Sequence, residues 1–315
     1  MDIIFTVCNR KNLTNALALA KSVMQFPGNK FYLCWVDTGV VPNLPIGINF
    51  ISIQELSIPN WDKMVDSYYD FELIPACRPW FAKHLIQILP DQNTFIFLAP
   101  TVLLFSSIND LLIAGSDMQL TPHISNPLSK SPILDDKRIL NIGMFHAGSW
   151  VLHKSEESLK FLEWWSIRTL DRAKFDLCNG MCLDQLWLNF GLVRMPNASQ
   201  ISNEGWHFGL HSVLNKEIIF LDGTYSVNNM PLISVDFAGL EEYNPIWSDY
   251  SSLLLKSNTF KMLHKKYRAS LDSFKAFLPS GQPGYGLILD VKKNRMLRKS
   301  ISNKIKSITE FIDQF

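Results

Sequence analysis

The first 120 residues alternate between short apolar runs and segments in which apolar side chains recur at helical spacing, and this alternation restricts the fold more than any other feature. The apolar runs are rich in β-branched and aromatic residues, as buried strands are, and cover residues 3–7, 30–36, 50–53 and 94–98. Helical spacing is found over residues 12–26 and 79–89. Strands that alternate with helices predict an α/β fold, in which a mostly parallel sheet is flanked by helices.

The middle of the chain continues this alternation less regularly. We expect strands over residues 118–121 and 142–152, and a helix over residues 156–170 that follows the capping residue Ser155. Residues 126–138 are polar and lie close to prolines, which predicts a loop. Residues 1–250 are therefore predicted to form one domain, and residues 251–315 a helical C-terminal extension.

The end of the extension is basic and amphipathic. Residues 291–306 contain seven Lys or Arg residues and no Asp or Glu. The apolar residues that share one helical face are Leu297, Ile301, Ile305, Ile308, Ile312 and Phe315. Two interpretations follow: a terminal helix that packs on its own domain or on a partner, or a helix that lies on an anionic membrane through residues 291–315.

The overall charge and the cysteines exclude several classes of protein. Thirty basic and 29 acidic residues leave a net charge of +1, which argues against nucleic acid as the main partner. The five cysteines are odd in number and scattered, as free thiols in a cytosolic protein are. No signal sequence and no membrane-spanning run are recognised. We therefore expect a cytoplasmic protein, with peripheral attachment to the inner face of the membrane as the variant that the basic helix suggests.

Five segments then carry a family resemblance in their order along the chain. They are TVCNRKNLTNALALAKSV (6–23), CRPWFAKHLI (77–86), LNIGMFHAG (140–148), FLEWW with CLDQLWLN (161–165 and 182–189) and VDFAG (235–239). Together they resemble nucleotide-sugar-dependent glycosyltransferases of the GT-A fold, most of all bacterial sugar transferases and more loosely those of family 8. The resemblance covers about residues 1–245. It implies transfer of a sugar from a nucleotide sugar, most naturally a UDP-sugar, to a hydroxyl of a glycan or protein acceptor.

The resemblance also implies roles for individual residues. Those expected to bind the nucleotide sugar are Thr6, Cys8, Asn9, Asp37, Arg78, Lys83, Ala99 and Thr101. Those expected to face the acceptor or the donor sugar are Asn141, Gly143 and His146. The catalytic candidates are Asp184, Gln185 and Asp236, and either carboxylate is a candidate general base for the acceptor hydroxyl. Trp206 offers an aromatic face on which a sugar ring could stack, with core packing as the alternative.

The chain departs from the family where a metal would be held. Such enzymes carry Asp-x-Asp after the fourth strand, because two carboxylates hold a divalent cation that offsets the diphosphate. Ala99 and Thr101 stand at these positions, and Asp236 stands where a histidine ligand is expected. We therefore predict no metal cofactor. The side chains expected to neutralise the diphosphate instead are Arg10, Lys11, Arg78 and Lys83.

Two further histidines have the spacing of metal ligands on one helix. His207 and His211 are four residues apart, like ligands on one helix, but Gly205 and Gly209 argue against a regular helix, so no metal is predicted there either. Two alternatives to a metal-independent enzyme stay open: a protein that binds a sugar nucleotide or glycan without turnover, and a fold reused as an assembly subunit. Retention of Asp184 and Gln185 favours the enzyme.

Overall fold

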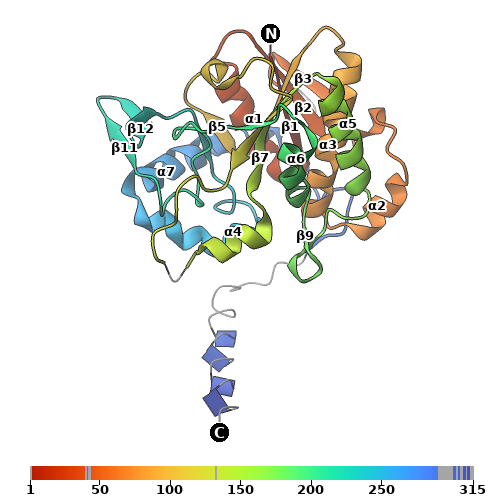
Figure 1. Cartoon of the computed structure of the whole chain (residues 1–315). Helices are drawn as coiled ribbons and strands as arrows, with labels where there is room; N and C mark the ends of the chain where they lie inside the picture. The colour runs from red at the N-terminus through yellow and green to blue at the C-terminus, as the bar shows by residue number, and fades with distance from the viewer. Residues whose placement is uncertain are drawn as a thin grey trace.

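A seven-stranded sheet forms the centre of the molecule, in the order β10-β6-β7-β4-β1-β2-β3 (Figure 1). The computed structural model describes residues 2–39, 41, 44–131 and 133–289, together with residues 301, 302, 304, 305, 308, 309, 311 and 312. The strands of the sheet are β1 (Asp2–Cys8), β2 (Asn29–Trp35), β3 (Ile48–Ser52), β4 (Thr94–Leu98), β6 (Met118–Pro122), β7 (Phe145–His153) and β10 (Ser199–Gln200). The predicted α/β class with a mostly parallel sheet is confirmed.

The direction of the strands determines where a ligand can bind. β1 pairs in parallel with β2 and with β4, and β2 pairs in parallel with β3. β7 is antiparallel to both β4 and β6. The carboxyl ends of β1 and β4 therefore meet the beginning of β7 at one edge of the sheet. Open α/β sheets bind their ligands at this edge.

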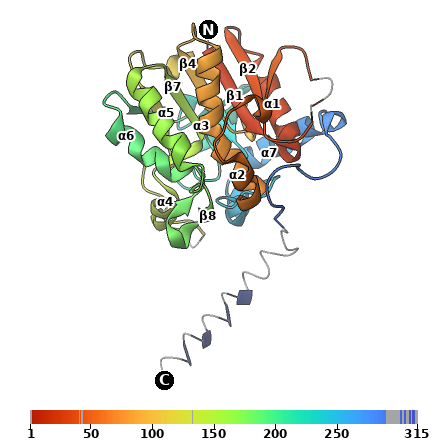
Figure 2. The same cartoon turned by 90° about the vertical axis from the view of Figure 1, so that its right-hand side faces the viewer.

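Helices cover both faces of the sheet, which explains why β1 is apolar along its length. The α-helices are α1 (Leu13–Val23), α2 (Trp61–Ser67), α3 (Asp70–Ile88), α4 (Asp136–Ile142), α5 (Glu156–Arg168), α6 (Gly191–Arg194) and α7 (Asn258–Asp272). Figures 1 and 2 show α3 and α5 side by side on one face of the sheet, with α1 and α7 on the other. Every residue of β1 from Ile3 to Cys8 is consequently buried.

Shorter elements complete the chain. The 3-10 helices are η1 (Arg10–Asn12), η2 (Ile53–Glu55), η3 (Asn109–Leu111), η4 (Leu177–Asn179), η5 (Gln185–Phe190), η6 (Ser248–Lys256) and η7 (Lys275–Phe277). The small sheets are formed by β5 (Val102–Leu104) with β14 (Ser234–Asp236), by β8 (Phe175–Asp176) with β9 (Met181–Cys182), and by β11 (Ile218–Leu221), β12 (Thr224–Val227) and β13 (Met230–Pro231).

Two boundaries differ from the sequence prediction. α3 begins at Asp70 and runs through Pro75 and Pro79, although proline disfavours a helix interior. Its first turn is fixed by Glu72, which accepts from the backbone N–H of Tyr69 at 3.0 Å. The loop expected over residues 126–138 is wrong at its end, because α4 begins at Asp136 and continues to Ile142. The strand expected from residue 142 is wrong at its start, because β7 begins at Phe145.

Part of the predicted extension packs on the main body. In α7, the hydroxyl of Tyr267 accepts from the side-chain amide of Asn15 on α1 at 2.6 Å, and its ring stacks on Phe237 at 4.1 Å. Near the C-terminus, the described residues between 301 and 312 are helical, and Ile301, Ile305, Ile308, Phe311 and Ile312 are exposed. No helix among the described residues is long and apolar enough to cross a bilayer.

Candidate functional site

A cavity of about 320 Å³ lies at the sheet edge where β1 and β4 end and β7 begins. Asn9 follows β1, Ala99 and Thr101 follow β4, and His146 belongs to β7. Arg78 reaches the cavity from α3, and Asp184 and Gln185 from the start of η5. Asp236 also lines the cavity, so the structure brings together predicted residues that are separated by up to 227 positions in the sequence.

A tight turn after β4 forms the floor of the cavity. The N–H of Ala99 continues the ladder to the carbonyl of Gly148 at 2.7 Å, and the N–H of Val102 then closes the turn on the carbonyl of Ala99 at 2.9 Å. Pro100 occupies the turn position that suits its fixed φ. Because β5 returns antiparallel to β14, the Thr101 hydroxyl donates to Oδ1 of Asp236 at 2.6 Å.

A buried ion pair joins α3 to the start of η5. Arg78 Nη1 donates to the two carboxylate oxygens of Asp184 at 3.0 and 3.3 Å, and the guanidinium lies 4.9 Å over the ring of Phe97. Leu183, at φ 54°, holds the left-handed conformation that costs a branched residue energy, and it directs the following carboxylate into the cavity. Burial raises the pKa of Asp184 to about 6, against the opposing effect of Arg78. This carboxyl therefore titrates close to neutral pH.

Gln185 holds the walls of the cavity in place. Its side-chain oxygen accepts from the N–H of Ala147 on β7 at 3.0 Å, and its side-chain nitrogen donates to the carbonyl of Ile142 on α4 at 2.8 Å. The amide thus bridges two elements that the chain reaches 40 residues earlier.

Asp37, expected to contact the nucleoside, is already fully engaged. Arg10 grips its carboxylate through Nε and Nη2, at 2.7 and 2.9 Å, and the N–H of Gly284 donates to it at 2.7 Å. Burial alone would raise the pKa of Asp37, but these hydrogen bonds hold it below its ordinary value. Nε and Nη2 of Arg10 are therefore already bonded to Asp37. The segment around Gly284 passes over the carboxyl end of β2.

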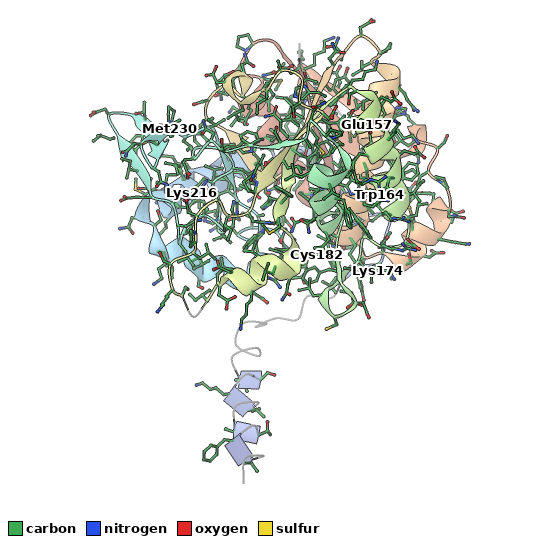
Figure 3. The ribbon with its side chains drawn as sticks, viewed as in Figure 1. Glu157, Trp164, Lys174, Cys182, Lys216 and Met230 are labelled. Atoms are coloured by element: carbon green, nitrogen blue, oxygen red, sulfur yellow. The ribbon has the colours of Figure 1, made fainter. Side chains whose placement is uncertain are left out.

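The structure places several other predicted residues away from the cavity. Lys83 on α3 pairs with Glu163 on α5, the helix on which Figure 3 labels Glu157 and Trp164, and neither partner lines the cavity. Trp206 is buried, and its Nε1 donates to the Thr121 hydroxyl at 2.8 Å, which is a core contact. Two more of the predicted nucleotide-binding residues, Thr6 and Cys8, are buried but do not line the cavity. Asn141 and Gly143 belong to the end of α4, outside the strand on which they were expected.

The cavity also contains residues that the sequence did not single out for the site. Asp70 at the start of α3 pairs with Lys11, whose Nζ lies 2.6 Å from Oδ2. Glu242 and Trp247 come from the irregular segment after β14. Burial raises the pKa of Glu242 above its ordinary value. No spacing signal points to these residues, because Asp70 begins a helix that the prolines obscure and the other two come from an irregular segment.

Four histidines lie together beside Asp236. The rings of His146 and His207 are 4.4 Å apart, and those of His123 and His211 lie 4.7 and 5.0 Å from His146. They come from three segments: the residue after β6, strand β7 and the loop before β11. Burial lowers the pKa of His207 to about 3, with smaller contributions from His123 and Lys216. The pKa values of the other three histidines are lowered as well, again mainly by burial. All four rings are therefore neutral at neutral pH.

The residues at the Asp-x-Asp position do not fit a divalent cation. Ala99 has no ligand atom, and the Thr101 hydroxyl points its hydrogen at Asp236. Hard cations prefer several carboxylate or carbonyl oxygens. We derive no step through a cation held by residues 99 and 101.

Comparison with known proteins supports the architecture. No protein-family profile matches the sequence, and no protein of curated function is recognisably similar to it in sequence. The galactosyltransferase LgtC, solved with donor and acceptor sugar analogs, is similar in structure with a TM-score of 0.50 and 14% identity, over 90% of this chain and 98% of LgtC. An active-site mutant of LgtC has a TM-score of 0.46 and 16% identity, over 84% of this chain and 96% of the mutant.

A glycosyltransferase involved in glycosylation of the major capsid of PBCV-1 is also similar, with a TM-score of 0.44 and 9% identity, over 80% of this chain and 99% of the viral one. At 14% identity, the likeness to LgtC concerns the architecture and not the chemistry. The strand order, the flanking helices and this likeness together show that the chain has the GT-A fold of glycosyltransferases.

Proposed function

We propose that the chain is a glycosyltransferase that moves a sugar from a nucleotide sugar to a hydroxyl of a glycan or protein acceptor. The observation that carries the proposal is the buried pair of Arg78 and Asp184, which faces a cavity at the ligand-binding edge of a GT-A fold. A carboxylate with a pKa of about 6, next to a guanidinium, is suited to acid–base chemistry near neutral pH.

The cationic groups of the cavity would receive the diphosphate. Arg78 and Lys11 are the Lys and Arg side chains among the described residues that line it. Arg78 keeps its Nε buried and without a partner, and an oxygen of a bound phosphate could accept from it. A UDP-sugar is the donor we favour, in keeping with the family that the sequence resembles.

The reaction needs one bond exchanged and one proton moved. The bond between the anomeric carbon and the diphosphate oxygen breaks, and its electron pair leaves with the nucleoside diphosphate. The acceptor oxygen forms the new bond to the anomeric carbon, and its proton passes to the Asp184 carboxylate. We propose that this proceeds without a cation at residues 99–101, so that positive side chains offset the charge of the leaving group.

A panel of nucleotide sugars tests the proposal. Release of the nucleoside diphosphate is followed with each donor, with and without candidate acceptors, for the wild type, Asp184→Asn and Asp272→Asn. Asp272 lies on the exposed surface of α7 and provides a matched control. We expect release with one donor class, and at least about a hundredfold loss in Asp184→Asn alone. Turnover that survives in Asp184→Asn would refute the assigned role.

The alternative is a protein that binds a sugar nucleotide or glycan without turnover. The loss of both carboxylates at residues 99 and 101 is the observation that favours it. It predicts that donors raise the melting temperature while no donor–acceptor pair gives product. The same panel therefore separates the two functions.

We also propose that the C-terminal helix brings the enzyme to the inner face of a membrane. The exposed isoleucines between residues 301 and 312, within a segment rich in Lys and Arg, support this. Sedimentation with anionic vesicles should require this segment and should decline at high salt. Salt-independent sedimentation, or sedimentation without residues 291–315, would contradict the proposal.

A further inference from the structure

Two histidines converge on one carboxylate oxygen at the back of the cavity. Nε2 of His207 lies 3.5 Å from Oδ2 of Asp236, and Nε2 of His146 lies 3.6 Å from the same oxygen. All three side chains are at least nine-tenths buried. Among the described residues, they form a group whose candidate ligand atoms all lie within 4.8 Å of one another.

The ligand atoms of this group have no other hydrogen-bond partner. Neither ring nitrogen of His207 is paired, and Nε2 of His146 is unpaired as well. A buried polar atom left in this state destabilises the fold unless it gains a partner. Oδ1 of Asp236, in contrast, accepts from the Thr101 hydroxyl at 2.6 Å and from the N–H of Ala238 at 3.0 Å. These two bonds fix the carboxylate so that Oδ2 faces both imidazoles.

The distances suit ligands of one ion better than hydrogen bonds. An N–H···O bond spans about 2.7–3.2 Å, which is shorter than either contact to Asp236. Zinc binds imidazole and carboxylate at about 2.0–2.2 Å, so two ligands at a tetrahedral angle stand about 3.4 Å apart. The observed separations of 3.5 and 3.6 Å are close to that value.

The backbone is shaped to make this convergence. His207 holds φ at 53°, a left-handed conformation that is costly for a non-glycine residue, and its N–H donates to the Ser234 hydroxyl at 2.8 Å. A Cβ at position 148 would lie 2.7 Å from the His146 ring and 3.2 Å from the His207 ring, so only glycine leaves room for both. Strain of this kind persists mainly at functional sites.

The cavity is lined by more acidic than basic side chains, which favours the binding of a cation. The carboxyl groups that line it among the described residues belong to Asp70, Asp184, Asp236 and Glu242, whereas its cationic side chains are only Lys11 and Arg78. A nucleoside diphosphate would add further negative charge. This part of the reasoning depends on the proposed function, but the geometry of the three side chains does not.

We propose that His146, His207 and Asp236 bind a borderline divalent cation of the Zn²⁺ class. Two imidazoles and one carboxylate are a typical ligand set for such an ion, and they leave a coordination position open. His146 and Asp236 line the cavity, while His207 stands behind them, so the open position faces the cavity. Thr101 stands where the family carries the second Asp of Asp-x-Asp. In this site its hydroxyl would orient the Asp236 ligand through the hydrogen bond to Oδ1.

His146 differs from the other two ligands in its protonation. Its Nδ1 accepts from the N–H of Gly148 at 2.8 Å, so the single hydrogen of the neutral ring is on Nε2. The hydrogen must be on Nδ1 instead, with loss of the bond from Gly148, before Nε2 of the neutral ring can bind a cation. Neither ring nitrogen of His207 accepts from a backbone N–H, so His207 and Asp236 form the core of the site. The expectation of metal-independent transfer considered residues 99, 101 and 236 and the pair of His207 and His211, but not the combination of His146, His207 and Asp236.

Binding of Zn²⁺ to the full-length chain tests the site without any nucleotide, so the result does not depend on transferase activity. Protein freed of metal with EDTA is titrated with Zn²⁺ against a chromogenic chelator. The proteins compared are the wild type, His207→Asn, Asp236→Asn and the control His84→Asn, whose histidine lies on α3 away from the cavity. We expect one equivalent to bind, with affinity lowered at least about tenfold in the first two variants and unchanged in the control.

Co²⁺ supplies a readout that needs no variant. Bound by two imidazoles and a carboxylate, it should show the intense visible absorption of four- or five-coordinate cobalt, which Zn²⁺ then removes. This keeps the proposal testable if the variants fail to fold. The absorption of the aqueous ion, less than a stoichiometric amount of Zn²⁺ bound, or equal affinity in all four proteins would overturn it.

Discussion

Protonation of Asp184 is predicted to slow sugar transfer progressively as the pH falls from 7 to 5. With a pKa of about 6, this carboxyl is about nine-tenths ionised at pH 7 and about one-tenth ionised at pH 5. If the ionised form takes the acceptor proton, the rate should fall about tenfold over this interval. A carboxyl at its ordinary pKa would stay ionised at pH 5, so the fall measures the effect of burial.

The same shift predicts how stability depends on pH. Because the pKa of Asp184 is higher in the folded than in the unfolded protein, protonation favours the folded state. The contribution of Asp184 to the free energy of unfolding is therefore largest below about pH 4 and is lost as the pH rises through about 6. Between pH 5 and pH 7 the loss amounts to about 1 kcal/mol.

The assay compares the wild type with Asp184→Asn. Nucleotide release by the wild type is followed from pH 5 to pH 8 with the identified donor, and urea denaturation of both proteins is measured at pH 5 and pH 7. The difference between the two proteins isolates Asp184, because the buried histidines act equally on both. A flat rate profile in folded wild type, together with an equal change in stability for both proteins, would refute the reasoning.

Two substitutions test predicted site residues that lie outside the cavity, and a third tests the close contact of Gly284 with Thr38. Lys83→Ala should leave the KM for the donor within about twofold, and a larger rise in the kinetic assay would return this lysine to the diphosphate. Trp206→Phe should lower the free energy of unfolding by about 1 kcal/mol through the lost hydrogen bond, with no change in donor KM; sugar stacking predicts the opposite pattern. Gly284→Ala would bring a Cβ within 2.1 Å of Thr38 Oγ1, so urea denaturation should show a loss of about 1–3 kcal/mol, and an unchanged midpoint would contradict this contact.

The sheet could be predicted from the sequence because each strand carries its own signal. Residues 3–7 and 94–98 are short runs of mainly β-branched and aromatic residues, and they correspond to β1 and β4. The start of α3 could not be predicted in this way, because Pro75 and Pro79 argue locally against a helix. There the burial of one face against the sheet and the first-turn contact of Glu72 outweigh the local preference.

Residues of the site could be predicted only where they follow a strand or belong to a recognisable segment. Asn9, Ala99, Thr101 and Asp184 satisfy this condition and line the cavity. Lys83 lies in a segment that resembles the family, residues 77–86. One side of that helix faces the sheet and the other faces solvent, and the resemblance does not say on which side Lys83 lies. The ion pair of Lys83 with Glu163 places it on the outer side.

The convergence of His146, His207 and Asp236 is beyond any argument from spacing. The sequence pairs His207 with His211, because they are four residues apart, whereas the structure pairs His207 with residues 61 positions before it and 29 after it. The pairing arises because Phe208 bridges to Val235 of β14, while β14 and β7 both approach the end of β4. A sequence that lacks one ligand set can therefore carry another on the same scaffold, since the sheet edge and not the motif brings the side chains together.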